Sequence, residues 1–230
     1  MSSPITASRF RQMATLVQGV IGASALMLSS ALTYGQSAPP VQGYTLLSPP
    51  QPTSSGSKVE VIEVFSYGCI HCAQFQPYVD EWSKRVDKST VEFSYLPATF
   101  NDLFQTMARG YYAADSLGVA KTTHHRVFNA LFEQGKQVRD IESLASLYAS
   151  LGVNREAFLK SAQSFFVESQ VRRADELMLK YKIDGTPTII VAGKYRVTGD
   201  SAGGNEKVFA VVDKLVAKER GAVRTLPKMR

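Results

Sequence analysis

The most regular hydrophobic pattern in the chain begins at residue 59. Val59 to Phe65 is rich in β-branched residues and largely apolar on both faces, which predicts a buried strand. The apolar positions that follow recur at three- and four-residue steps, which predicts a helix with one buried stripe: Phe75, Val79, Trp82 and Val86. Val91 to Leu96 predicts a second strand. Together these segments predict a strand–helix–strand unit, so we expect an α/β architecture.

Residues 101–181 have helical spacing and almost no strand pattern. We expect four or five helices, with breaks near Gly118, Gly135 and Gly152, and with Asn154 capping a long helix that continues to Lys180. The apolar stripes are interpreted as core packing: Leu103, Met107, Tyr111, Val127, Leu131, Leu144, Leu147, Tyr148, Leu151, Phe158, Ala162, Phe165 and Phe166. His124 and His125 are interpreted as surface residues of this helical segment.

The strand pattern returns near the C-terminus. Thr188 to Val191, a turn at residues 192–194 and Tyr195 to Val197 predict a hairpin. A last amphipathic helix is expected from Asn205 to near Glu219, and the basic tail, residues 221–230, is expected to lack order. Ahead of residue 58, a segment rich in Pro, Ser and Gly, residues 36–57, has too little apolar content for a domain, although residues 44–47 could form a short edge strand.

The N-terminus has the pattern of an export signal. Arg9 and Arg11 precede an uncharged run over residues 13–32, and small residues follow, so residues 1–35 are predicted to be a signal peptide. The run is close to the roughly 20 residues that span a bilayer, which leaves an uncleaved membrane anchor open. Cleavage would leave 230 − 35 = 195 residues and lower the net charge from +6 to +4, because the segment holds two arginines and no acids.

Composition narrows the function classes. The full chain is 44% hydrophobic, enough to fill the core of one compact domain with an inserted subdomain. The cationic residues are dispersed among acidic ones, so we do not expect a nucleic-acid surface.

The chain has two cysteines, Cys69 and Cys72, placed directly after the first strand at the predicted start of a helix. Free N–H groups and the positive end of the helix dipole stabilise a thiolate at this position, so Cys69 is the better nucleophile. Cys72 lies one turn deeper, where it can attack a mixed disulfide on Cys69. The pattern indicates dithiol–disulfide chemistry in which one thiol attacks and the other resolves.

Three other interpretations of the pair are weaker. A structural zinc site takes four ligands, and His71 shares one turn with both cysteines, which is poor tetrahedral geometry. Haem attachment needs a histidine after the second cysteine, but Ala73 stands there. An inert structural disulfide across a two-residue loop would stabilise little.

These segments and motifs resemble the DsbA family. The resemblance covers roughly Tyr44 to Glu219, and its most specific parts are Glu63-Val64-Phe65-Ser66-Tyr67-Gly68-Cys69-Ile70-His71-Cys72 and Thr186-Pro187. It implies an α/β, thioredoxin-like fold with an inserted α-helical domain: residues 58–100 and 182–220 form the two parts of the thioredoxin-like domain, and residues 101–181 form the insertion. It also implies an exported, periplasmic thiol:disulfide oxidoreductase.

The resemblance assigns roles to particular residues. Cys69 matches the nucleophile, Cys72 its buried partner, and His71 the histidine that helps to hold the thiolate. Pro187 matches a cis proline that faces the cysteines, and it would present the backbone of Thr186 to an incoming peptide. No cofactor is implied beyond the redox-active disulfide.

Glu63 matches a buried acid beneath the active site. Strand alternation puts it on the same face as Val61 and Phe65, which favours burial. A buried carboxyl has a raised pKa and could exchange a proton with Cys72. A half-exposed glutamate at the end of the strand is the alternative.

Three departures from the family pattern limit what the resemblance implies. Ile70 stands where proline is commonest in the family, which leaves the redox potential open, and Thr186 is familiar from isomerase and reductase relatives, which leaves the direction of the reaction open. No lysine accompanies the buried acid on the second strand, Val91 to Leu96. The expected function is the introduction of disulfide bonds into exported cysteine-containing proteins by a monomer that a membrane DsbB-type partner reoxidises. An isomerase or reductase of the same fold, and a peptide-binding chaperone, are the alternatives.

Overall fold

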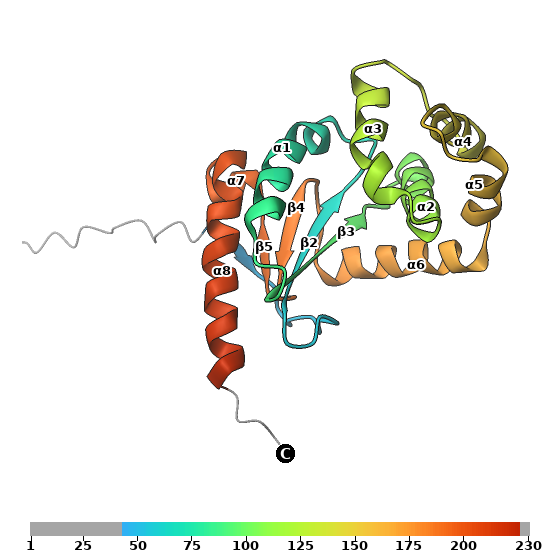
Figure 1. The fold of residues 1–230 in the computed structure, drawn as a ribbon. Coiled ribbons are helices and arrows are strands. Elements are labelled where there is room, and N and C mark those ends of the chain that lie inside the picture. Colours follow the sequence, from blue (N-terminus) through green and yellow to red (C-terminus); the bar gives the residue numbers. More distant parts are fainter. Residues whose placement is uncertain (1–42, 226–230) are drawn as a thin grey trace, which may run out of the picture. The chain divides into compact units, whose positions relative to one another are not determined.

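The computed structural model describes residues 43–225, and a five-stranded mixed sheet lies at its centre (Figure 1). The strands are β1 (Thr45–Leu46), β2 (Val59–Phe65), β3 (Val91–Pro97), β4 (Thr188–Val191) and β5 (Tyr195–Val197), in the spatial order β1-β5-β4-β2-β3. β2 and β3 are parallel, whereas β4 pairs with β2 and β5 in antiparallel fashion. The predicted thioredoxin-like fold with a helical insertion is confirmed.

The strand–helix–strand unit forms as predicted. Helix α1 (Ile70–Arg85) connects the parallel strands β2 and β3, and the predicted stripe position Val86 is the residue that caps its C-terminus. Every residue of β2 is buried, because helices cover both faces of the sheet.

Alternation along β2 sends its side chains to two different cores. Val61 packs with residues of α1 and of α8 (Asn205–Thr225) on one face, and Ile62 and Val64 pack with residues of α6 (Phe165–Lys180) on the other. The Trp82 indole N–H of α1 donates to Asp213 of α8 at 2.8 Å and links the two helices of the first face. Glu63 belongs by alternation to the face covered by α1.

The helical segment contains five helices among the described residues. Figure 1 shows them grouped on the side of the sheet where β3 lies. They are α2 (Asp102–Ser116), α3 (Ala120–Phe132), α4 (Ile141–Ser150), α5 (Arg155–Ala162) and α6. The predicted breaks near Gly118, Gly135 and Gly152 fall between helices, which confirms them.

Two predictions for this segment are wrong. The single long helix after Asn154 is two helices, because the Ser164 side chain accepts a hydrogen bond from the Val167 N–H and starts α6 anew. Phe165 and Phe166 are 80% and 53% exposed, so they do not belong to the core. Leu103 is also exposed, at the start of α2. The remaining stripe residues pack in or against the core of the insertion.

The C-terminal elements follow the predicted order. β4 and β5 form the hairpin, β1 adds an edge strand against β5, and a short helix that the sequence did not indicate, α7 (Gly199–Ala202), precedes α8. α8 continues to Thr225, past the predicted end near Glu219, so the expectation that the tail lacks order is wrong for residues 221–225, which are helical.

Several predictions fall outside the described residues. The signal peptide of residues 1–35, the first part of the segment 36–57 and the last five residues of the basic tail are among them. Within residues 43–225, no helix is long and apolar enough to cross a membrane.

Candidate active site

Cys69 and Cys72 stand at the N-terminus of α1 with contrasting surroundings. Cys69 is the N-cap residue, half-buried, and its sulfur accepts a hydrogen bond from the Cys72 backbone N–H at 3.3 Å. Cys72 is fully buried in the core that α1 shares with the helical insertion. Both are free thiols.

These surroundings move the two thiol pKa values in opposite directions. Hydrogen bonding from the Cys72 thiol, from Thr186 and from the backbone N–H groups of Cys72 and His71 lowers the pKa of Cys69 to about 5, although burial acts against it. Burial, followed by the neighbouring Cys69 sulfur, raises the pKa of Cys72 well above its ordinary value. At neutral pH the pair therefore holds one half-buried thiolate and one fully buried thiol.

The loop before β4 faces the cysteine pair. The Thr186–Pro187 peptide bond is cis, which confirms the prediction, and the Cys69 sulfur lies 3.5 Å from the Thr186 carbonyl oxygen. The loop closes on itself through the Thr188 hydroxyl, which donates to the Gly185 carbonyl at 2.8 Å. Residues 117 positions apart in the chain thus meet at one sulfur atom.

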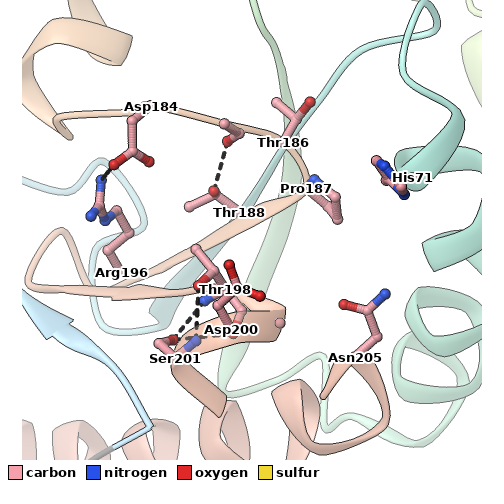
Figure 2. Close-up of a pocket in the computed structure, with 12 residues that line it drawn as sticks. His71, Asp184, Thr186, Pro187, Thr188, Arg196, Thr198, Asp200, Ser201 and Asn205 are labelled. Carbon is pink, nitrogen blue, oxygen red and sulfur yellow. Dashed lines mark hydrogen bonds and ion pairs between the residues drawn. The ribbon is translucent and has the colours of Figure 1, made fainter. Parts of the chain in front are cut away.

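A cavity of about 730 Å³ opens beside this loop. Figure 2 shows its lining residues arranged around it, with Asp184 and Arg196 at one end and His71 and Asn205 at the other. His71 is exposed and contributes its side chain to the cavity wall. The cavity therefore joins the active-site helix to the cis-proline loop, β5 and α7.

The sequence did not single out the polar wall of this cavity. Arg196 and Asp184 form an ion pair at 3.1 Å, and the side chains of Thr198 and Ser201 cap α7 reciprocally. A Thr-x-x-Ser pattern before a short helix was the available signal for the cap. Asp184 and Arg196 are brought together by the hairpin, which spacing alone does not reveal.

Glu63 is buried on β2, as the alternation pattern predicts. It is 0% exposed, and burial raises its pKa well above the ordinary value, while a hydrogen bond from the Gln76 amide at 3.1 Å acts in the opposite direction. Its Oε2 atom has no hydrogen-bond partner among the described residues. A carboxyl of raised pKa thus lies on the sheet face that α1 covers.

His124 corrects the sequence interpretation, whereas His125 agrees with it. His125 is exposed and pairs with Asp80 at 3.0 Å, but His124 is only 4% exposed. The available signal was helical spacing, because His124 stands three and four residues before the buried Val127 and Phe128. No group of three or more His, Cys, Asp or Glu side chains within residues 43–225 is arranged to hold a metal ion.

Comparison with known proteins places this geometry in a family context. A family profile described as "DSBA-like thioredoxin domain" matches residues 92–216. The thiol:disulfide interchange protein DsbA of Pseudomonas aeruginosa is 37% identical over 181 residues, 79% of this chain and 85% of the relative. The protein of the same name from Pseudomonas syringae pv. tomato is 36% identical over 208 residues, 89% and 97% of the two chains.

Solved structures show the same similarity. The crystal structure of Pseudomonas aeruginosa DsbA superposes with a TM-score of 0.76 at 37% identity, covering 80% of this chain and 95% of that one. The oxidoreductase NmDsbA1 from N. meningitidis has a TM-score of 0.68 at 27% identity, with coverage of 79% and 94%.

Proposed function

The chain belongs to the family of DSBA-like thioredoxin-domain proteins and is a thiol:disulfide oxidoreductase that introduces disulfide bonds, and we propose that Cys69 and Cys72 are its redox-active pair. The observation that carries this assignment is the geometry of α1: an accessible sulfur of lowered pKa at the helix N-cap, with a buried thiol one turn behind it. No cofactor beyond the Cys69–Cys72 disulfide is part of the proposal.

The proposed reaction is two successive thiol–disulfide exchanges. A substrate thiolate attacks the Cys69 sulfur of the Cys69–Cys72 disulfide, a mixed disulfide forms, and Cys72 leaves as a thiolate that takes a proton from Glu63. A second substrate thiolate then attacks the substrate sulfur of the mixed disulfide and releases the Cys69 thiolate. The substrate is oxidised by two electrons to a disulfide, and the enzyme is reduced to the dithiol.

The hydrogen bonds around Cys69 favour its role as leaving group. The backbone N–H groups of His71 and Cys72 stabilise the thiolate that the second exchange releases. Burial raises the pKa of Glu63, which suits its carboxyl to exchange a proton with a thiol whose own pKa is also raised. His71 acts through its backbone N–H and as part of the cavity wall.

The substrate site in this proposal is the cavity beside the cis-proline loop. The backbone at Thr186 borders both the Cys69 sulfur and the cavity, so an extended peptide can pair with it while its cysteine reaches Cys69. Backbone pairing tolerates many sequences, which suits a range of cysteine-containing substrates.

The proposal also covers the cellular compartment, the reoxidising partner and the oligomeric state. The N-terminal pattern supports export to the periplasm, where disulfides persist, with the signal either cleaved or kept as an anchor. Each turnover leaves a dithiol, so an oxidant must restore the disulfide, and the family resemblance supports a membrane partner of the DsbB type. We propose that the enzyme acts as a monomer.

Substitution of Cys69 tests the assignment. Oxidised protein is mixed with a reduced, unfolded protein that contains several cysteines, and disulfide formation is followed by thiol trapping and mass spectrometry. We expect transfer by the wild type and none by Cys69→Ser. Full transfer by Cys69→Ser would overturn the assignment of the redox pair.

A peptide-binding chaperone is the second candidate, and the cavity beside Pro187 is the observation that favours it. Aggregation of a cysteine-free unfolded protein distinguishes the two functions. If binding alone were the function, Cys69→Ser and wild type would suppress aggregation equally and would not differ in cells. Loss of in-cell activity in Cys69→Ser supports the oxidoreductase.

A further inference from the structure

A chain of buried polar side chains runs from Glu63 into the helical insertion. The Gln76 amide N–H of α1 donates to Glu63 Oε1 at 3.1 Å, and Gln76 Oε1 lies 3.2 Å from His124 Nε2 of α3. His124 Nδ1 lies 2.9 Å from the Tyr67 hydroxyl, in the loop that precedes the cysteines. All four side chains are buried, with at most 4% exposure.

This series of hydrogen-bonded side chains lies on the same side of α1 as the buried Cys72 thiol. Gln76 follows Cys72 by four residues, so the two side chains occupy the same face of the helix in successive turns. Because Gln76 reaches Glu63 from this face, the Glu63 carboxyl lies beneath the face of α1 that also carries Cys72.

The hydrogen bonds allow one assignment of donors and acceptors. Gln76 uses its N–H on Glu63, so its oxygen must accept from His124 Nε2–H, and His124 Nδ1 must then accept from the Tyr67 hydroxyl. This assignment needs a neutral imidazole, and burial provides it by lowering the pKa of His124 to about 3. The donors therefore point in one direction along the chain, toward Glu63 Oε1.

The two oxygens of Glu63 consequently differ. Oε1 accepts the bond from Gln76, whereas Oε2 is buried with no partner among residues 43–225. A buried, unpartnered carboxylate oxygen is costly, and protonation of that oxygen removes the cost. Oε2 is thus the oxygen suited to hold a proton.

We propose that His124 is a positioning residue for proton exchange: it fixes the Gln76 amide, which holds Glu63 so that Oε2 carries the proton passed to and from Cys72. The inference rests on the proposed role of Glu63. When the enzyme is reoxidised, the Cys69 thiolate attacks the disulfide of the oxidant, and one oxidant thiolate leaves as a mixed disulfide forms. Cys72–SH then gives its proton to Oε2 and attacks the Cys69 sulfur of the mixed disulfide, and the second oxidant thiolate leaves. The helical insertion thereby contributes to the chemistry of the other domain.

Other ionisable groups near the chain must be held constant in a test. Asp80 and Cys69 act on the charge of Glu63, His125 acts on that of His124, and the phenols of Tyr95 and Tyr111 lie within reach of the Glu63 charge. None of them is substituted in the experiment.

The test measures the step that needs the proton exchange. Reduced full-length protein is mixed with excess glutathione disulfide, which forms a mixed disulfide on Cys69, and acid quenching with mass spectrometry follows both its formation and its closure to Cys69–Cys72 over a pH series. Formation depends on the Cys69 thiolate. Closure depends on deprotonation of Cys72, so the two steps serve as internal controls for each other.

Four variants separate positioning from packing. His124→Phe removes both hydrogen bonds but suits the aromatic surroundings formed by Phe65, Tyr67, Tyr95 and Phe128. His124→Gln keeps an N–H donor for Gln76. Gln76→Met removes the hydrogen bond to Glu63 without changing His124, and it replaces His124→Phe in the test if that variant does not fold. Phe128→Leu is the packing control, since it loosens the same cluster without a polar change.

We expect His124→Phe and Gln76→Met to slow closure on the order of tenfold and to change its pH profile, with mixed-disulfide formation unchanged. His124→Gln should recover most of the rate, and Phe128→Leu should close at the wild-type rate. Glu63→Gln should slow closure on the order of a hundredfold, and adding His124→Phe to it should bring no further loss.

Two results would overturn the inference while leaving the role of Glu63 intact. One is wild-type closure by His124→Phe and Gln76→Met when Glu63→Gln is slow. The other is that His124→Phe slows closure by the same factor in the wild type and in the Glu63→Gln variant, which would indicate a packing effect. Closure at the wild-type rate by Glu63→Gln would instead remove Glu63 from proton exchange, and the inference with it.

Discussion

Two sulfur atoms three residues apart have opposite character because one turn of helix separates a free N-terminus from a core. The Cys69 sulfur accepts hydrogen bonds from the Cys72 thiol and from backbone N–H groups in the first turn of α1, whereas the Cys72 side chain is buried among apolar side chains. The same thiol chemistry thus yields a thiolate at one position and a protonated thiol at the other. Residue identity alone would not distinguish them.

Alkylation of the reduced protein should show this difference directly. We expect iodoacetamide at mildly acidic pH to label Cys69 and to spare Cys72, because the thiolate is the reactive form and the Cys69 pKa is lowered to about 5. The labelling rate of Cys69 should rise through that pH, as read by mass spectrometry of peptides. Unfolding in urea is the control, since it should make the two cysteines equally reactive. Equal labelling in the folded protein would contradict the assigned roles.

At the scale of single elements, the β4–β5 turn fixes the strand that follows the cis-proline loop. Ala192 has a φ of 52° and Gly193 a φ of 62°, both in the left-handed region. The Gln51 N–H donates to the Gly193 carbonyl at 2.8 Å. A Cβ atom added to Gly193 would lie 2.2 Å from the backbone oxygen of Gln51. The turn is therefore held against the segment before β2 by a contact that only glycine allows.

Two substitutions at neighbouring positions should have opposite effects on stability. Ala192→Gly relieves the left-handed strain and should raise the free energy of unfolding by about 0.5–1 kcal/mol. Gly193→Ala adds both strain and a clash with backbone, and should lower it by about 2 kcal/mol or more. Urea unfolding followed by Trp82 fluorescence measures both. A Gly193→Ala protein as stable as the wild type would show that the segment at Gln51 does not pack on this turn.

The elements that followed from sequence are those whose pattern is local. The strand at Val59–Phe65, the hairpin and the helix breaks at glycines depend on neighbours within a few residues, so periodicity and turn residues were sufficient. His124 and Gln76 escaped notice because a polar residue on a buried stripe is read as exposed unless its partner is known. That partner lies 48 residues away in the chain, and only the packing of α3 on α1 provides it.

The prediction of one continuous helix over residues 155–180 failed for a related reason. Spacing of apolar residues across Phe165 and Phe166 continued the helical pattern, but the Ser164 cap interrupts it, and both phenylalanines face outward. The parts of the site that lie in short sequence motifs, Cys69, Cys72 and Pro187, were predicted from the sequence. The polar wall of the cavity, including Asp184 and Arg196, required the fold.

For the whole molecule, the state of one sulfur is linked to the stability of the fold. The pKa of Cys69 falls from an ordinary value of 9.0 to about 5 in the reduced folded protein, so the thiolate favours the folded state. This contribution is complete above the pKa of the unfolded thiol, and it is lost as the pH falls from 9 toward 5. The disulfide form has no thiol to ionise and gains nothing from it. Reduction should therefore stabilise the fold at neutral pH.

The same linkage predicts the direction of electron flow. If reduction stabilises the folded chain, closing the Cys69–Cys72 disulfide is less favourable in the folded than in the unfolded protein, and the folded disulfide is a good oxidant. Equilibration against graded glutathione buffers with thiol trapping should give a clearly oxidising potential. Thermal unfolding of both forms should show the reduced protein to be the more stable, by a margin that grows from pH 5 to pH 9.

Ile70→Pro is a useful control for the thiolate environment, because position 70 is the first residue of α1, where proline fits and no N–H bond to the Cys69 sulfur is lost. We expect the reduction potential of Ile70→Pro to stay close to that of the wild type.

A wild-type potential near that of thioredoxin would contradict the oxidising direction. It would indicate an isomerase or reductase that needs a supply of electrons, in agreement with Thr186 before the cis proline. The direction of the reaction would then be set by the loop at Thr186 rather than by the helix that stabilises Cys69.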